Sequence, residues 1–278
     1  MALSILNNIA SLTAQNQLSI TQTNLQKTLF QLSSGSRINS GADDAAGLAI
    51  ANGLQANVTA LTQSANNAAS GIGSLQVADG ALSQVTTLLN RAVTLSTEAA
   101  TGTVSSSQRG ALDAEFTQIK AEIDRIGTTT TFNGTSVFTA STTSIFLSDA
   151  ASSSQIGVTV GTLASSAITS GGTTTNLGAD DLTTAVKAQS ALGDINSAIA
   201  SVAGIRGSIG AGINRLQSAV NVINNQTQNL TAAQDQITAA NIPEQVAKLS
   251  QYTILNQSGI SALAQANSAQ SSILNLLR

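Results

Sequence analysis

Branched aliphatic residues recur at every seventh position near the C-terminal third of the chain, and this repeat restricts the fold more than any other feature. The positions are Ile195, Val202, Ile209, Leu216, Ile223, Leu230 and Ile237. Such a period, sustained over several heptads, is typical of a coiled-coil helix. At 1.5 Å per residue this helix would be about 60 Å long. A helix of that length with a one-sided apolar stripe needs a second long helix to cover it.

Residues 45 to 100 supply a matching stripe. Its seven-spaced positions are Leu54, Leu61, Ala68, Leu75, Leu82 and Leu89. The intervening sequence is long enough for the two helices to run antiparallel. Asp79 and Arg206 each interrupt an apolar seam, and polar seam residues often fix the register of paired helices. The sequence alone leaves open whether these two side chains meet.

The first thirty-odd and the last thirty-odd residues form amphipathic patterns whose polar faces are nearly uncharged. The apolar positions that we expect to contact other copies are Leu18, Leu25, Leu32, Leu249, Ile260, Leu263, Leu274 and Leu277. Only 9% of the whole chain is charged, which suits a surface covered by identical neighbours. A peripheral helix on a globular core is the alternative interpretation of the N-terminal segment.

Both ends are expected to be largely disordered in the free chain. Ordering a backbone costs roughly 1–2 kcal/mol per residue, while one antiparallel pair buries only one apolar stripe on each helix. Neighbouring copies would supply the missing burial, so that folding is coupled to assembly.

A turn of unusual composition follows the first helix. Gly35 is placed to end that helix in a left-handed conformation, and Asn39 or Ser40 is placed to cap the next helix. Asp43 and Asp44 would then fall in its first turn, where the helix dipole favours carboxylates. These roles leave Arg37 unexplained. We expect Arg37 to contact a neighbouring copy, with Asp43 or Asp44 as candidate partners.

The middle of the chain changes character. A third helix is predicted from a capping box at Ser105 and Gln108 to Gly127, which is expected to end it. Residues 128–181 are rich in Thr, Ser and Gly, and Asn133-Gly134 predicts a hairpin. Further strands are predicted at 145–147 and 156–160, and an exposed loop at 165–178. The predicted fold is mainly α: a long antiparallel coiled-coil or helical-bundle rod with a small β-hairpin region.

Composition excludes several classes of function. The chain has no cysteine and no histidine, which removes disulfides, thiol chemistry, imidazole bases and most zinc sites. No nucleophile, base and orienting group can be assembled from its motifs, so we expect no enzyme activity and no cofactor. A net charge of −3 without a basic patch argues against nucleic acid. The absence of a positively charged leader and of a long apolar run argues against a Sec signal and membrane insertion.

Three stretches carry a resemblance to a known family. The run Leu32–Ile50 closely resembles the N-terminal signature of bacterial flagellins, and Ile209–Leu216 with Leu263–Asn267 looks like the C-terminal signature. The resemblance implies a structural subunit that self-assembles into the flagellar filament for motility. It implies a terminal helix pair (1–40 with 240–278) lining the filament, a rod (41–239) with a hairpin region at about 128–181, and no substantial outer domain.

Two other classes stay open at this point. The hook–filament junction protein shares both terminal patterns but forms a short ring of copies. A secreted coiled-coil adhesin or effector would not polymerise. One departure from the family pattern is also present, because flagellins usually carry acidic residues where this chain has 239–243, Ala-Ala-Asn-Ile-Pro.

The resemblance also implies partners and a location. These are many identical copies, the flagellar type III export apparatus, an export chaperone, and the cap and hook-junction proteins, with the product extracellular and exported without a Sec signal. Some flagellins are detected by a host innate receptor through a helical face, and the matching positions here are Leu89, Arg91, Leu95 and Glu115. Val93 and Thr94 replace charged residues of detected members, so we expect weak or absent detection.

Overall fold

The computed structural model describes residues 8–148, 154–170 and 173–276, and the chain divides into two compact units. We call them the terminal unit (Met1–Ala56 with Asn229–Arg278) and the rod unit (Asn57–Gln228). The sequence placed the boundaries near residues 40 and 240, in the loops between helices. The residue ranges of the two compact units divide within helices α2 (Ala45–Ala100) and α4 (Ala185–Thr238).

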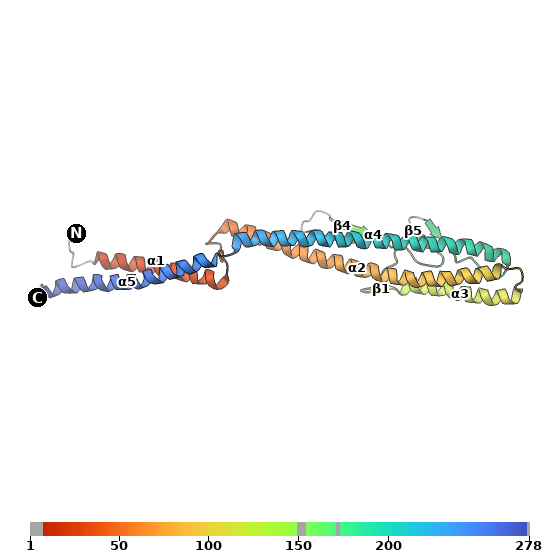
Figure 1. Cartoon of the computed structure of the whole chain (residues 1–278), viewed down its shortest axis with the longest axis horizontal. Coiled ribbons are helices and arrows are strands. Elements are labelled where there is room, and N and C mark those ends of the chain that lie inside the picture. Colours follow the sequence, from red (N-terminus) through yellow and green to blue (C-terminus); the bar gives the residue numbers. More distant parts are fainter. Residues whose placement is uncertain (1–7, 149–153, 171–172, 277–278) are drawn as a thin grey trace. The chain divides into compact units, whose positions relative to one another are not determined.

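In the terminal unit, helices α1 (Ile9–Ser34) and α5 (Ile242–Leu276) lie side by side and antiparallel (Figure 1). Asn8 Nδ2 donates to the carbonyl oxygen of Ala266 at 3.1 Å, near the far end of α5. Midway along the pair, Gly259 lies against Leu18. Helix α1 ends at Gly35, whose φ of +69° is left-handed. This confirms the predicted cap, because glycine adopts that conformation without a steric cost.

In the rod unit, the heptad seams of α2 and α4 pack against each other as an antiparallel pair. Residue numbers rise along α2 as they fall along α4, since Gly71 lies beside Leu216 and Leu75 lies beside Gly212. Ten seam residues are at most 4% exposed: Leu61, Ala68, Leu75, Leu82, Leu89, Ile195, Val202, Ile209, Leu216 and Ile223. The three remaining seam residues, Leu54, Leu230 and Ile237, are half-buried and belong to the terminal unit.

Helix α3 (Ser106–Thr129) covers the C-terminal half of α2. Ser105 and Gln108 form the predicted capping box. Its apolar face is buried at Phe116, Ile119, Ile123 and Ile126. The prediction that Gly127 ends this helix is wrong, because α3 continues to Thr129 and Gly127 is buried within it. A side chain there would collide with the carbonyl oxygen of Leu163, so the glycine serves a close approach of backbone.

Three small antiparallel hairpins follow α3. The first joins β1 (Thr131–Phe132) to β2 (Thr135–Ser136). Asn133 and Gly134 between them have φ values of 50° and 77°. Positive φ at both turn residues is what the tight hairpin turn requires, which confirms the Asn-Gly prediction. The second hairpin pairs β3 (Thr143–Phe146) with β4 (Gln155–Val158), close to the predicted strands.

The third hairpin corrects the prediction of an exposed loop at 165–178. Strands β5 (Ile168–Ser170) and β6 (Thr173–Thr175) pair within that segment. Ile168 and Leu177 are fully buried. Ser165 donates from its backbone N–H and its hydroxyl to the carboxylate of Asp124, at 2.6 and 2.9 Å. The segment is therefore held against α3 rather than exposed.

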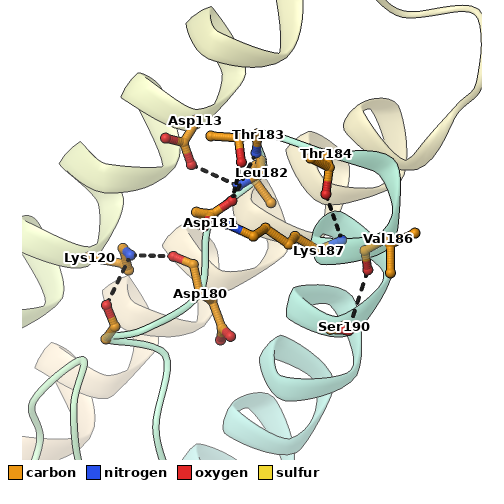
Figure 2. A network of polar contacts seen from close by, with 11 residues as sticks. Asp113, Lys120, Asp180, Asp181, Leu182, Thr183, Thr184, Val186, Lys187 and Ser190 are labelled. Atoms are coloured by element: carbon orange, nitrogen blue, oxygen red, sulfur yellow. Dashed lines mark hydrogen bonds and ion pairs between the residues drawn. The ribbon is translucent and has the colours of Figure 1, made fainter. Parts of the chain in front are cut away.

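The chain leading into α4 is also tied to α3, as Figure 2 shows. Lys120 Nζ donates to the backbone carbonyl of Asp180 at 2.6 Å, and the backbone N–H of Leu182 donates to Asp113 Oδ1 at 2.7 Å. Asp181 forms an ion pair with Lys187 in the first turn of α4. These contacts fix where α4 starts.

The predicted fold class is confirmed: mainly α, with small hairpins in the middle. Over the described ranges, no helix has the length and apolar character needed to cross a membrane.

Candidate subunit interface

The terminal helix pair exposes an unusual amount of apolar surface. Among described residues, ten of the fifteen exposed large hydrophobic side chains lie on its two helices: Ile9, Leu12, Ile20, Leu29 and Phe30 on α1, and Ile242, Val246, Ile254, Leu255 and Ile260 on α5. The charged residues of these helices are Lys27, Glu244 and Lys248. So many exposed large hydrophobic side chains with so little charge among them indicate an interaction site.

The pair is closed mainly by small side chains. In α1 the buried side chains are Thr21 and Thr28, seven residues apart, each 4% exposed. Their hydroxyls donate to carbonyls one turn back, at Gln17 and Asn24. Because each hydroxyl is satisfied within α1, both threonines are buried without an unpaired polar atom. The larger apolar residues flank the contact instead of filling it.

The predicted interface residues lie along the flanks of this contact. Half-buried positions are Leu18, Leu25, Leu32, Leu249 and Leu263, whereas Ile260 is 52% exposed. The Leu274 side chain and Leu277 lie outside the described residues. Sequence reasoning missed the off-seam residues Ile20, Phe30 and Ile254. The signal that could have found them is an apolar residue on the face of an almost uncharged helix where a charge is normally expected.

The segment that follows α1 is hydrogen-bonded to the chain at the end of α4 and just after it. The backbone N–H of Arg37 donates to Thr238 O at 2.7 Å, and that of Ala240 donates to Gly35 O at 2.9 Å. Arg37 is exposed, and its Nη2 donates to Ile237 O at 2.8 Å. The guanidinium therefore satisfies a carbonyl at the C-terminal end of α4, where a cation also suits the helix dipole.

Asp43 stabilises the turn that precedes α2. Its carboxylate pairs with Lys27 of α1 at 2.6 Å and accepts from the backbone N–H groups of Asn39 and Ser40 at 3.2 and 3.1 Å. The hydrogen bond from Lys27, with smaller contributions from Asn39 and Ser40, lowers the pKa of Asp43 to about 2. Asn39 is half-buried, and its side chain donates to Ser36 O at 3.0 Å.

The start of α2 differs from the expectation. The helix begins at Ala45, and Asp44 caps it by accepting from the backbone N–H of Gly47 at 2.8 Å. The prediction that Asn39 or Ser40 caps this helix is therefore wrong, and Asp43 and Asp44 precede its first turn. The physical reason is that the Asp43 carboxylate already binds the backbone of 39–40 in a separate turn.

A groove of about 500 Å³ lies between α1 and α5 beside this turn. Its cations are Lys27, Arg37 and Lys248, and Glu244 is on its wall. Glu244 and Lys248 form an ion pair at 2.6 Å on successive turns of α5. The groove is thus polar and positively charged within an otherwise neutral surface.

Asp79 and Arg206, the two polar residues that interrupt the apolar seams of the rod, contact each other. Arg206 Nε and Nη2 donate to the two carboxylate oxygens of Asp79 at 2.8 and 3.3 Å. Both side chains are about 40% exposed, so the pair lies at the edge of the seam. It links α2 to α4 at one fixed register.

The residues matched to a host-receptor face do not form one exposed face. Leu89 and Leu95 are fully buried, which corrects that expectation for these two positions. They belong to the stripe of α2 that packs into the rod core. Arg91 and Glu115 are exposed and form a bidentate ion pair, with Arg91 Nε at 2.7 Å from Glu115 Oε1.

Across the residues that the structure describes, no cluster of acidic side chains could hold a metal ion.

Comparisons with known proteins give a consistent result. The model of the bacterial flagellin N-terminal helical region matches residues 5–143, and that of the C-terminal helical region matches residues 192–277. A flagellin from Halalkalibacterium halodurans is 33% identical over 98% of this chain and 98% of its own length. A flagellar filament 33 kDa core protein from Treponema phagedenis is 34% identical over 98% and 99%. A Bacillus cereus flagellin crystal structure, 28% identical, covers 61% of this chain and 94% of that chain with a TM-score of 0.48.

Proposed function

The chain belongs to the bacterial flagellin family, a family of structural proteins whose identical subunits polymerise, and we propose that its terminal helix pair carries the contacts of that polymer. The chain is accordingly a structural subunit of the flagellar filament. The observation that supports the terminal pair is the concentration of exposed large hydrophobic residues on α1 and α5. Copies of the same surface would bury these residues without bringing like charges together.

The hook–filament junction protein, which forms a short ring of copies, is the less favoured alternative. The relative from Treponema phagedenis, which matches nearly the whole chain, is a flagellar filament core protein, and neither of the two relatives above is described as a junction protein. In a non-polymerising adhesin, the exposed apolar residues of the terminal helices would remain in contact with water, without a partner surface to cover them. We assign no catalytic role, because filament formation needs none.

Family membership also supports a set of partners beyond the polymer itself. We expect export through the flagellum's own type III apparatus with an export chaperone, followed by contact with the cap and hook-junction proteins. For the host receptor we expect weak or absent detection, because Val93 and Thr94 stand where detected members are charged.

Seeded assembly followed by electron microscopy tests the function. Purified full-length protein should extend seeds into filaments of indefinite length. Short rings would favour the junction protein, and persistent monomers would contradict polymerisation altogether.

A matched pair of variants tests the proposed surface. Phe30 of α1 is 62% exposed and Phe146 of the hairpin region is 40% exposed. Burying a phenylalanine stabilises by roughly 1.5–3 kcal/mol, so Phe30→Asn should raise the critical concentration about tenfold or more. Phe146→Asn, the control, should change it little. Equal effects of the two substitutions would contradict the assignment to α1 and α5.

A further inference from the structure

All cationic side chains in the described part of the terminal unit line the same groove. Lys27 projects from α1, Arg37 from the turn after it, and Lys248 from α5. Against these three cations the groove wall has one carboxylate, that of Glu244. Charges are scarce everywhere else on the two helices, so this convergence requires an explanation that the apolar surface does not provide.

The three cations retain hydrogen-bonding capacity after their contacts within the chain. Lys27 pairs with Asp43 and Lys248 pairs with Glu244, each at 2.6 Å. Arg37 donates through Nη2 to one backbone carbonyl. An ammonium group has three N–H donors and a guanidinium has five, so donors remain on each. The side chains of Lys27 and Lys248 are 52% and 44% exposed, which leaves them accessible to an acceptor that enters the groove.

Gln245 adds a buried polar group to the same groove. Its side chain is 6% exposed, and its Oε1 has no hydrogen-bond partner among the described residues. A half-turn of the amide exchanges its oxygen and nitrogen, so this position can present an N–H donor to an acceptor. An unpaired buried amide is costly, and a ligand in the groove would remove that cost.

Assembly through the terminal pair determines what chemistry the ligand must have. If a neighbour covered the groove with an uncharged surface, three cations would leave water with two carboxylates, Asp43 on Lys27 and Glu244 on Lys248, and Arg37 would have no carboxylate partner among the described residues. Removing an ion from water costs several kcal/mol unless it is paired and hydrogen-bonded. A carboxylate from the neighbouring copy would pair with the surplus positive charge and accept the remaining N–H donors.

The acidic residues of the terminal unit identify the source. Asp43 and Glu244 are in ion pairs and Asp44 caps α2, which leaves Asp235. Asp235 is exposed, and its side chain has no partner among the described residues. It lies in the last turn of α4, where its backbone carbonyl accepts from the N–H of Ala239 at 2.8 Å. Since Ala239 lines the groove and Asp235 does not, the carboxylate lies near the level of the groove but outside it.

We propose that, in the filament, the Asp235 carboxylate of one copy enters the groove of a neighbouring copy and binds Lys27, Arg37 and Lys248. The contact is heterologous: one surface carries the carboxylate and a different surface carries the groove. Contacts of this kind repeat from copy to copy without closing, as a filament requires. This inference rests on the proposed function. It also replaces Asp43 and Asp44 as the expected partners of Arg37, because both have roles within their own chain.

Charge reversal in the full-length protein tests the contact. Asp235→Lys and Lys248→Asp should each raise the critical concentration for seeded assembly at least about tenfold, since a like-charge contact at an interface costs several kcal/mol. The matched double variant, with both substitutions, should return to within about threefold of the wild-type value. A mismatched double, Asp235→Lys with Arg215→Asp, has the same net charge but places the second reversal on an exposed position of α4 in the rod unit, and it should not be rescued.

Circular dichroism of each monomer separates loss of assembly from loss of folding. The proposal is overturned if Asp235→Lys assembles at the wild-type critical concentration, or if the matched double assembles no better than the mismatched one. If the wild-type protein itself forms no filaments, the proposed function fails first, and that result is distinguishable from failure of this contact alone.

Discussion

Glycine residues in the long helices occupy two different kinds of position. Gly207 of α4 is exposed, and nothing lies within 4 Å of where a Cβ atom would be. Gly212, five residues later, is buried, and a Cβ atom there would lie 3.1 Å from Val158 Cγ1. Sequence does not distinguish the two, because the difference depends on a β-strand that packs against one face of the helix.

This difference predicts opposite effects of the same substitution. Gly207→Ala should stabilise the rod by about 1 kcal/mol, since alanine favours a helix by that amount over glycine. Gly212→Ala should lose that gain to overpacking against Val158. Urea unfolding of the two variants measures this directly, and a more stable Gly212→Ala than Gly207→Ala would contradict the packing described.

The ion pair of Lys27 and Asp43 gives a prediction about pH. The pKa of Asp43 is lowered to about 2 from 3.8, so folding favours its ionised form. The stabilisation is therefore fully present above about pH 4 and is lost as the pH falls toward 2. Lys27→Gln should raise the pKa of Asp43 part of the way to its ordinary value, because the backbone N–H groups of 39 and 40 remain.

A carboxyl titration of assembled filaments, followed by solid-state NMR, tests this shift, because α1 is expected to be ordered only there; Asp181 is the internal control. The hydrogen bond from Lys187, and then that from Thr183, lowers the pKa of Asp181 to about 2. That value should not respond to Lys27→Gln. An unchanged pKa of Asp43 in filaments of the variant would show that the ion pair does not form in the assembled protein.

At the scale of elements, the seams of α2 and α4 hold the rod together and one ion pair sits at their edge. Asp79 and Arg206 are each about 40% exposed. Exposed pairs contribute only about 0–1 kcal/mol. The ten buried seam residues must therefore carry most of the stability, while the ion pair adds preference for one register.

A double-mutant cycle with Asp79→Ala and Arg206→Ala should accordingly give a coupling energy below about 1 kcal/mol. Each single variant should unfold cooperatively, with its seams intact. A coupling above about 2 kcal/mol would place the pair among the main determinants of rod stability instead.

The elements differ in how far the sequence predicts them. Helix α2 spans residues 45–100 as predicted, because its heptad stripe is long and periodic. Strands β5 and β6 were missed because three residues are too few to show a period of two, and Thr and Ser are equally common in loops. The contact of Arg37 with Ile237 joins residues 200 positions apart, and no local pattern signals it. Gly35 and Asn133-Gly134 were predictable because their backbone conformations are local.

At the scale of the whole molecule, the two units bury apolar surface to very different extents. The rod unit contains nearly all of the buried aliphatic residues, whereas α1 buries two threonines among its described side chains and α5 buries one glutamine. The rod can thus be stable in a single copy. The terminal pair gains few buried contacts for the cost of ordering about sixty residues, at roughly 1–2 kcal/mol each, so we expect it to be stable only in the filament.

Hydrogen exchange compared between monomer and seeded filament measures this difference most directly. Amides of α1 and α5 should exchange rapidly in the monomer and become strongly protected in the filament, as folding coupled to assembly requires. Amides along the seams of α2 and α4 should be protected in both states and serve as the internal reference. Strong protection of α1 and α5 already present in the monomer, unchanged on assembly, would contradict the role of the terminal pair as the surface that neighbouring copies complete.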